Sequence, residues 1–384
     1  ASGIRGQLGD AVLAGEMEKP VILRTHGARP RAIEAGELQI DVAFIGASAS
    51  DDYGNCTGQI GPNACGSLGY AFVDAHNAGC VVVVTDHLVE YPCLPTSISQ
   101  QYVDYVVKVG QIGDPEKIGK GAARLTKNPR DLMIAERTAD VIAASRLFKD
   151  GFSFQTGAGA IAIATTKYLA DRMRERGVKA SFALGGIPAA IIDMYDEGLV
   201  RVVECSQSFD AVAAAAISTR PGVVEIDNAD YANAYSKGGF LNREDFGVLG
   251  ALEVDTDFNV NILTGSSGEM MGGLGGGHAD AVVVVDFLDG DLGTLLGDIL
   301  IPGLAGALGH VDHCLLAQLV SRPGHAPAVV AVRGGEEGGV AELLAECLAG
   351  QVVVGHLADV PAHLLGDVPG HGEGAAQHLE GVEA

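Results

Sequence analysis

A glutamate at the end of an apolar segment is the first residue in this sequence whose position suggests chemistry. Glu253 lies in GALEVDTDFNVN (residues 250–261), where a strand-like run meets an acidic turn. The commoner explanation of such a residue is a strand glutamate on the solvent face. The functional alternative is a carboxylate nucleophile that attacks a thioester carbonyl and forms a mixed anhydride. That chemistry needs an oxyanion hole and a pocket that limits attack by water.

A glycine-rich stretch follows Glu253 in the chain. In GEMMGGLGGGHADA (residues 268–281), five of the six residues at 272–277 are glycine. Such a backbone can direct several amides at one oxygen, as a tetrahedral oxyanion requires. A flexible loop without a ligand is the alternative, and spacing alone does not show that the loop meets Glu253.

A second glycine motif predicts an anion-binding turn. TGAGAIA (residues 156–162) fits G-x-G-x-x-A, and the backbone amides of Gly157 and Gly159 would hold an anion at the start of a helix. A dinucleotide site would also need an acid at the end of the next strand. That strand, ASFALGGI (residues 180–187), has none. A nicotinamide oxidoreductase is therefore the weaker alternative, beside a simple packing turn.

Two further groups have weaker signals. Arg29 in THGARP lies at a predicted strand end, where it would clamp a substrate carboxylate, cap a helix or form a surface ion pair. His310 and His313 in HVDH lack a third ligand at a recognisable spacing, so we predict no metal site.

The elements that would position these residues alternate between strand and helix. This alternation predicts an α/β fold with a mostly parallel sheet. The segment 151–177 reads as a strand, a glycine turn and a helix, and the segment 248–263 reads as a hairpin turning at Asp255–Asp257. The other predicted elements are a helix at 130–148 and strands at 41–49, 80–88, 103–112, 180–187 and 199–207.

Charge and cysteine content limit the partners. The formal net charge of −24 argues against nucleic acid or an anionic membrane, although a local pocket can still receive an anionic substrate. The seven cysteines form no CxxC pair, which is typical of free thiols in a reducing compartment. We therefore predict a cytoplasmic protein, and no apolar run of spanning length or signal peptide is evident.

The chain divides into three predicted segments. We expect a first α/β domain at 1–148, a second with Glu253 at 149–280, and an acidic continuation of the second domain at 281–384. This last segment has no lysine, two arginines and fourteen acids, so 2 − 14 gives −12 of the total charge of −24. A shifted reading frame is one hypothesis for the change in composition. Sequencing the gene through codon 281 tests it, and an unchanged frame would reject it.

The motifs in combination resemble a known family. The sequence resembles the alpha subunit of citrate lyase, a citrate CoA-transferase, from residue 2 to about residue 280. The resemblance implies two open α/β domains of the CoA-transferase type, the first truncated at its start, and an exchange of acetyl for citryl on a carrier thioester. The segments that carry it are SGIRGQLG, GELQIDVAFIGASASDDYGN, CGSLGYAFVDAHNAGCVVVVT, KDGFSFQTGAGA, FALGGI, QSFD, YAN, SKG and ALEVDTDFNVNILTGSSG.

The resemblance also assigns roles to residues. GALEVD stands where CoA-transferases carry the nucleophilic glutamate, so Glu253 inherits that role. GGHAD stands where they carry an oxyanion loop, which nominates the backbone of Gly276 and Gly277; Gly275 replaces the usual serine. Beyond residue 281 the sequence departs from the family pattern. The remaining substrate-binding candidates are Gly157, Gly159, Gly185 and Gly186, beside Arg29.

The resemblance implies partners rather than a resident cofactor. No cofactor is expected to be bound permanently, since the acyl carrier (gamma) subunit supplies the thioester of a CoA-derived prosthetic group. The beta subunit cleaves the citryl thioester, and citrate and acetate are the small-molecule substrate and product. The alternatives are an acyl-CoA:carboxylate CoA-transferase, a thioester hydrolase on the same scaffold, and a non-catalytic assembly subunit.

Overall fold

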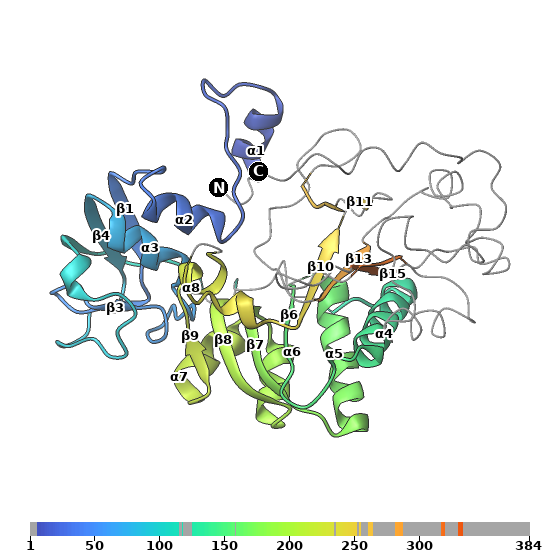
Figure 1. Ribbon diagram of the computed structural model, residues 1–384. Coiled ribbons are helices and arrows are strands. Elements are labelled where there is room, and N and C mark those ends of the chain that lie inside the picture. The colour runs from blue at the N-terminus through green and yellow to red at the C-terminus, as the bar shows by residue number, and fades with distance from the viewer. Residues whose placement is uncertain are drawn as a thin grey trace, which may run out of the picture.

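The structure is a computed structural model with two sheets as its framework (Figure 1). We define the first unit as residues 28–108 and the second as residues 129–251, with further strands joining the second sheet. The structure describes residues 6–114, 117, 125–157, 159–233, 236–251, 253–254, 260–263, 281–286, 316–318 and 329–332.

The first unit is a three-stranded parallel sheet with helices on one face. Its strand order is β1 (Val42–Gly46), β4 (Cys80–Thr85) and β5 (Tyr105–Lys108). Burial alternates along β4, so every second side chain enters the core beneath α3 (Gly69–Asn77). The smaller elements are α2 (Ala28–Glu34), β2 (Ala49–Ser50), β3 (Cys56–Thr57) and η1 (Gln100–Tyr102).

The second unit is built on an eight-stranded sheet with the order β14-β15-β13-β10-β6-β7-β8-β9. All neighbours in it are parallel except β14 and β15, which confirms the predicted mostly parallel α/β fold. The bounds of the strands are β6 (Ser153–Thr156), β7 (Ala180–Ile187), β8 (Val200–Ser208), β9 (Val223–Glu225), β10 (Phe246–Ala251), β13 (Ala281–Asp286), β14 (Leu316–Gln318) and β15 (Val329–Val332).

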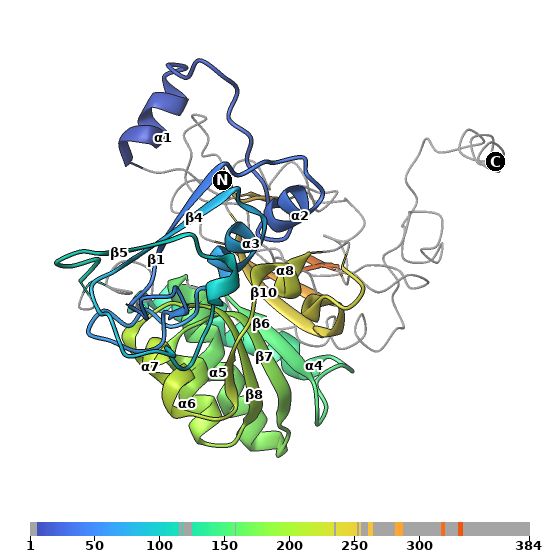
Figure 2. The same cartoon turned by 90° about the vertical axis from the view of Figure 1, so that its left-hand side faces the viewer.

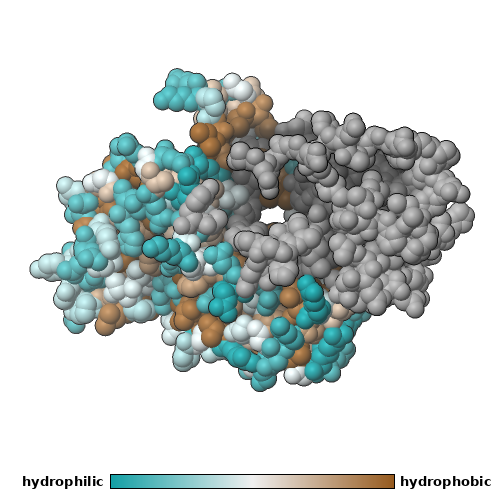
Figure 3. Space-filling model, in the orientation of Figure 1, coloured by the Kyte–Doolittle hydropathy of each residue, from teal (hydrophilic) through white to brown (hydrophobic). Residues whose placement is uncertain are grey.

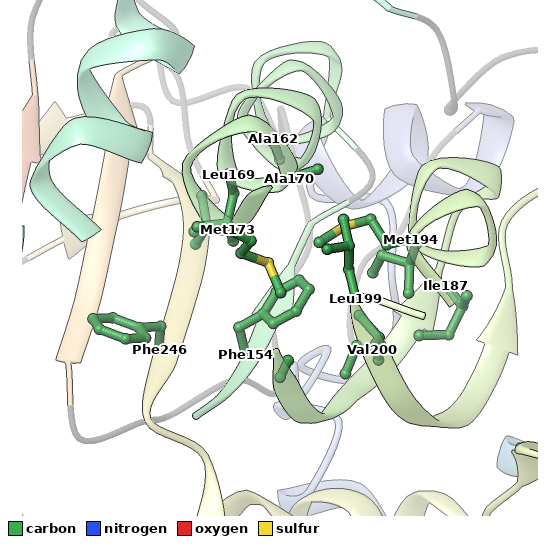
Figure 4. Close-up of a cluster of buried hydrophobic side chains, with 14 of the residues drawn as sticks. Phe154, Ala162, Leu169, Ala170, Met173, Ile187, Met194, Leu199, Val200 and Phe246 are labelled. Carbon is green, nitrogen blue, oxygen red and sulfur yellow. The ribbon is translucent and has the colours of Figure 1, made fainter. Parts of the chain in front are cut away.

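Four helices cover one face of the second sheet (Figures 1 and 2). Phe154 lies at the centre of this core, and Met173 is directed toward its ring (Figure 4). The opposite face of the sheet carries Leu184, which packs with Tyr231 and Leu241. The helices beneath are α4 (Pro129–Ala144), α5 (Ala160–Arg176), α6 (Ala189–Asp196) and α7 (Ala211–Thr219); α8 (Asn228–Ala232) and η3 (Phe240–Arg243) lie on the opposite face.

The predicted helix at 130–148 is shorter in the structure. It begins as expected, because the Asn128 side chain accepts a hydrogen bond from the Arg130 amide and Pro129 occupies the first turn. It ends at Ala144, since Ser145 is extended and its hydroxyl accepts a hydrogen bond from the Leu147 amide. That local hydrogen bond competes with continuation of the helix. In the structure α4 packs in the core of the second sheet. The domain boundary near residue 148 stays a prediction.

The predicted hairpin at 248–263 is correct only in part. Residues 246–251 form β10, which lies between β6 and β13 in the parallel sheet. The antiparallel pair is confined to β11 (Glu253–Val254) and β12 (Val260–Asn261). A short apolar run reads alike as one arm of a hairpin or as a buried parallel strand, and only its sheet neighbours distinguish the two.

The described surface is mostly hydrophilic in the view of Figure 3, with scattered apolar patches. One patch lies on α1 (Gly6–Leu13), where Leu8 and Leu13 are exposed. A second set is the open face of the first sheet, where Phe44 and Tyr105 are 74% and 63% exposed. Among the described helices, none combines the length and the apolar character needed to cross a bilayer.

Candidate active site

The carboxyl ends of the parallel strands bring the candidate residues to one edge of the second sheet. Strands β10, β6, β7 and β8 are neighbours that run in the same direction. Glu253 follows the end of β10, and Gly157 and Gly159 follow the end of β6. Ligands of open α/β sheets bind outside this carboxyl edge. The fold therefore places these candidates where such a protein usually has its site.

Glu253 begins the short strand β11. Its backbone pairs with Asn261 in the antiparallel β11–β12 hairpin, directly beyond the end of β10. This pairing holds the Glu253 backbone in a strand rather than in a free loop. The Glu253 side chain and the glycines at 276 and 277 lie outside the described residues, so their contact stays a prediction.

The G-x-G-x-x-A turn has one amide already engaged. The Gly157 amide donates to the Val248 carbonyl at 3.1 Å, which joins the end of β6 to β10. Gly159 is the extended N-cap of α5, and its carbonyl accepts from the Ile163 amide at 3.0 Å. The helix start thus faces the carboxyl edge as the sequence predicts, and anion binding there stays a prediction.

Gly185 and Gly186 form an irregularity in β7 that tight packing explains. The pairing of β7 with β8 shifts register between them, and Gly185 has a φ of +96°. A side chain at Gly185 would lie 3.2 Å from the Gln155 side chain, and one at Gly186 would lie 2.0 Å from the Phe209 ring. Both positions therefore exclude a larger residue. A role in substrate binding stays a prediction.

A buried polar pair lies above the sheet beside this irregularity. The Tyr231 hydroxyl on α8 donates to Gln155 Oε1 on β6 at 2.9 Å. Burial raises the pKa of Tyr231, so the hydroxyl remains a hydrogen-bond donor near neutral pH. Sequence analysis did not single out this pair, because its members lie on separate elements that only the fold brings together.

The carboxyl group of Glu244 lies near this pair, and the carboxyl group of Glu204 lies near Glu244. Glu244 is 1% exposed, and within the described structure neither carboxyl oxygen has a hydrogen-bond partner. Burial, with Asp245 and Glu204 nearby, raises the pKa of Glu244, and burial also raises the pKa of Glu204. Burial thus shifts both groups toward the neutral form relative to an exposed glutamate. A signal existed in the sequence for Glu204, a glutamate within the apolar strand LVRVVECSQ.

Arg29 is committed to an ion pair within the first unit. Its Nη2 donates to both carboxylate oxygens of Asp74, at 2.7 and 2.8 Å. This joins α2 to α3, one of the roles that the sequence left open for Arg29. The predicted carboxylate clamp would have to use the remaining Nη1, which has no hydrogen-bond partner among the described residues.

The described residues offer no cluster of three or more His, Cys, Asp or Glu side chains that could hold a metal ion. An open hollow of about 540 Å³ lies on the first unit between the end of α2 and the start of β1. None of the predicted site residues lines this hollow, so we assign the candidate site to the sheet edge.

The fold and the position of Glu253 together define an open, mostly parallel α/β protein with its candidate site at the carboxyl edge of the sheet. Comparison with known proteins narrows this class. The family model described as "Citrate lyase, alpha subunit (CitF)" matches residues 1–336. The chain belongs to the citrate lyase alpha subunit family, and the match passes the change in composition at residue 281.

Curated relatives agree with this assignment. The citrate lyase alpha chain of Klebsiella pneumoniae is 48% identical over 285 residues, which cover 74% of this chain and 56% of the relative. The alpha chain of Escherichia coli K12 is 46% identical over 322 residues, which cover 81% of this chain and 63% of the relative. The chain thus spans less than two thirds of the length of these relatives.

Solved structures show the same architecture. An alpha subunit of citrate lyase from Streptococcus mutans, in complex with citrate, has a TM-score of 0.75 at 42% identity. The likeness covers 91% of this chain and 66% of that one. A Pseudomonas malonate decarboxylase hetero-tetramer has a chain with a TM-score of 0.52 at 17% identity, covering 70% of this chain and 48% of that one. This second likeness shows the fold alone.

Proposed function

We propose that this chain acts as a citrate CoA-transferase, with Glu253 as the covalent nucleophile that exchanges acetyl for citryl on a carrier thioester. The observation that carries the proposal is the place of Glu253 directly beyond β10, at the carboxyl edge of the sheet. The family supplies the substrate class, since the Streptococcus mutans relative was solved with citrate.

The proposed cycle has four acyl transfers. The Glu253 carboxylate attacks the acetyl thioester carbonyl, which forms an acetyl-glutamyl anhydride and releases the carrier thiolate. That thiolate attacks the glutamyl carbonyl, which releases acetate and leaves a glutamyl thioester. A citrate carboxylate attacks this thioester, giving a citryl-glutamyl anhydride and thiolate. The thiolate then attacks the citryl carbonyl, which forms the citryl thioester and restores Glu253.

Each addition places negative charge on a carbonyl oxygen. In our proposal the amides of Gly276 and Gly277 stabilise that oxyanion, and the turn at Gly157 and Gly159 receives an anionic part of the substrate. Amides whose positions are fixed before the reaction stabilise the oxyanion more than solvent dipoles do, because solvent dipoles must first reorient.

The partners follow from the same proposal. The thioester belongs to a CoA-derived prosthetic group carried by a gamma (acyl carrier) subunit, and a beta subunit cleaves the citryl product. No cofactor is bound permanently to this chain. The cysteines described in the structure are free thiols, which supports the cytoplasmic location that we propose.

Replacing Glu253 with glutamine tests the role of the carboxylate. Because an amide is a poor nucleophile, we expect Glu253→Gln to lower citrate-dependent transfer from acetyl-CoA by about 10³-fold or more. Glu16→Gln is the matched control, since Glu16 is exposed beside α1 and should leave the rate unchanged. Near-normal turnover of Glu253→Gln would refute the role of Glu253 as the nucleophile.

Trapping the intermediate separates the proposal from its rivals. Borohydride reduces a glutamyl thioester to an alcohol, so peptide mapping after incubation with acetyl-CoA should find the reduced side chain at position 253. Release of free thiol without a carboxylate acceptor would identify a thioester hydrolase instead. Absence of any trapped residue, with no turnover, would leave a non-catalytic assembly subunit.

A further inference from the structure

Glu225 ends β9, the edge strand of the eight-stranded sheet, and lies at the same carboxyl edge as the end of β10. Its carboxylate accepts three hydrogen bonds, all from the first unit. The Leu68 amide donates to Oε1 at 2.5 Å, whereas Gln59 Nε2 and Ser97 Oγ donate to Oε2 at 2.8 and 2.6 Å. One side chain of the second unit therefore holds three separate segments of the first.

The three donors belong to a connected network. Thr57 Oγ1 lies 3.0 Å from Ser97 Oγ and accepts a hydrogen bond from the Gln59 amide at 3.2 Å. Leu68 is the N-cap residue of α3, so its bond to Glu225 acts at the start of that helix. A shift of the Glu225 carboxylate would therefore move β3, α3 and the segment before η1 together.

The backbones of the two units also approach closely beside Glu225. A side chain at Gly69, the first residue of α3, would lie 2.2 Å from the Ser206 carbonyl of β8 and 2.9 Å from the Ile226 carbonyl. Only glycine permits this approach. This contact limits how close the two units can lie.

We propose that Glu225 is the positioning residue that holds the first unit in register with the sheet edge that carries Glu253. Charge-assisted hydrogen bonds of this length are among the stronger polar contacts in proteins. The effect of this positioning on catalysis rests on the proposed transferase function. A misplacement of about 1 Å between reacting groups lowers a rate by about 10²-fold.

Glu225→Ala removes all three acceptors, and its effect on transfer should fall on kcat. With acetyl-CoA and citrate as probes, we expect kcat to drop about 10- to 100-fold while KM changes less than about threefold. Glu225→Gln should keep at least about a third of the wild-type kcat, because the side-chain carboxamide of Gln59 can flip so that its Oε1 accepts, and the Ser97 hydroxyl oxygen can accept as well. Glu197→Ala is the control, since its ion pair with Arg174 lies within the second unit.

A double-mutant cycle isolates the contact with Ser97. Ser97→Ala alone should lower kcat, and the combined variant Glu225→Ala with Ser97→Ala should be no worse than Glu225→Ala. Additive losses of kcat would mean that the two side chains act separately, which would overturn the shared role.

Hydrogen exchange tests the contact without activity. In Glu225→Ala, amides of residues 58–69 and 97–102 should exchange faster, whereas those of α4 and α5 should not change. Unchanged exchange in both segments would refute the proposal. Faster exchange with wild-type kcat and KM would refute the effect on catalysis. If the wild-type chain shows no transfer, the proposed function fails and exchange alone decides the role of Glu225.

Discussion

At the scale of single residues, Glu244 is the most unusual ionisable group that the structure describes. Its carboxyl is buried without a described hydrogen-bond partner, and burial, with Asp245 and Glu204 nearby, raises its pKa. A group with a raised pKa in the folded state stabilises the protein below its unfolded pKa, and that stabilisation is lost as pH rises. Glu244 therefore lowers the stability of the fold progressively as pH rises above the range in which an unfolded glutamate ionises.

Glu244→Gln should remove this sensitivity. We expect the variant to gain about 1–3 kcal/mol of unfolding free energy relative to wild type between pH 5 and pH 8, because a neutral amide never ionises. Urea unfolding at both pH values measures the difference. Glu197→Gln, at an exposed site, should show no such gain. Equal pH dependence of Glu244→Gln and wild type would contradict the prediction.

At the scale of elements, Asp51 organises the turn between β2 and β3. Its Oδ1 accepts from the amides of Tyr53, Gly54 and Asn55, and its Oδ2 accepts from the Cys93 amide and Asn55 Nδ2. Burial would raise the pKa of Asp51, but the hydrogen bonds from Cys93, Asn55 and Tyr53 outweigh it and lower the pKa. The turn therefore depends on an ionised carboxylate.

Asp51→Asn should destabilise the first unit by roughly 2–3 kcal/mol, since the amide nitrogen cannot accept the bonds that reach one carboxylate oxygen. Asp52→Asn is the control, because Asp52 is adjacent and exposed. The loss should be full above about pH 4 and shrink at lower pH, where the wild-type carboxylate also becomes protonated. Thermal unfolding of both variants at pH 7 and pH 3 measures this; equal stability of the two at pH 7 would contradict it.

At the scale of the whole molecule, the two units meet around α8 in an acidic environment. Burial, with the charges of Asp230, Glu34 and Asp74, raises the pKa of Asp227 to about 6, against the effect of its hydrogen bond from the Ala229 amide. Glu34 lies on α2 and Asp74 on α3, so ionised Asp227 repels the first unit. Neutral Asp227 contributes stability at low pH, and this contribution is lost as pH rises through about 6.

Asp227→Asn should stabilise the protein at pH 7.5 by about 1–2 kcal/mol and leave it unchanged near pH 4, since asparagine caps α8 equally well. Unfolding free energies at the two pH values measure the effect. Asp10→Asn, an exposed site on α1, is the control. Equal stability of Asp227→Asn and wild type at pH 7.5 would contradict the prediction.

The sequence by itself determined the strand–helix alternation and the nomination of Glu253. Both depend on local patterns: hydrophobic periodicity marks elements such as β4 and α5, and a carboxylate at a strand end stands out by residue type. The sequence did not determine where α4 ends, because a hydrogen bond at Ser145 decides it. It also did not determine how residues 246–261 divide between β10 and the β11–β12 pair, because the neighbouring strands decide that division.

Only the tertiary structure decided which distant residues meet. Gln155 and Tyr231 lie 76 positions apart, and Glu225 lies 128 to 166 positions from its three donors. The strand order β10-β6-β7-β8-β9 and the packing of α3 on the second unit create these contacts. No local pattern encodes such pairs, since each residue has an ordinary neighbourhood in the chain and gains its role through packing across the fold.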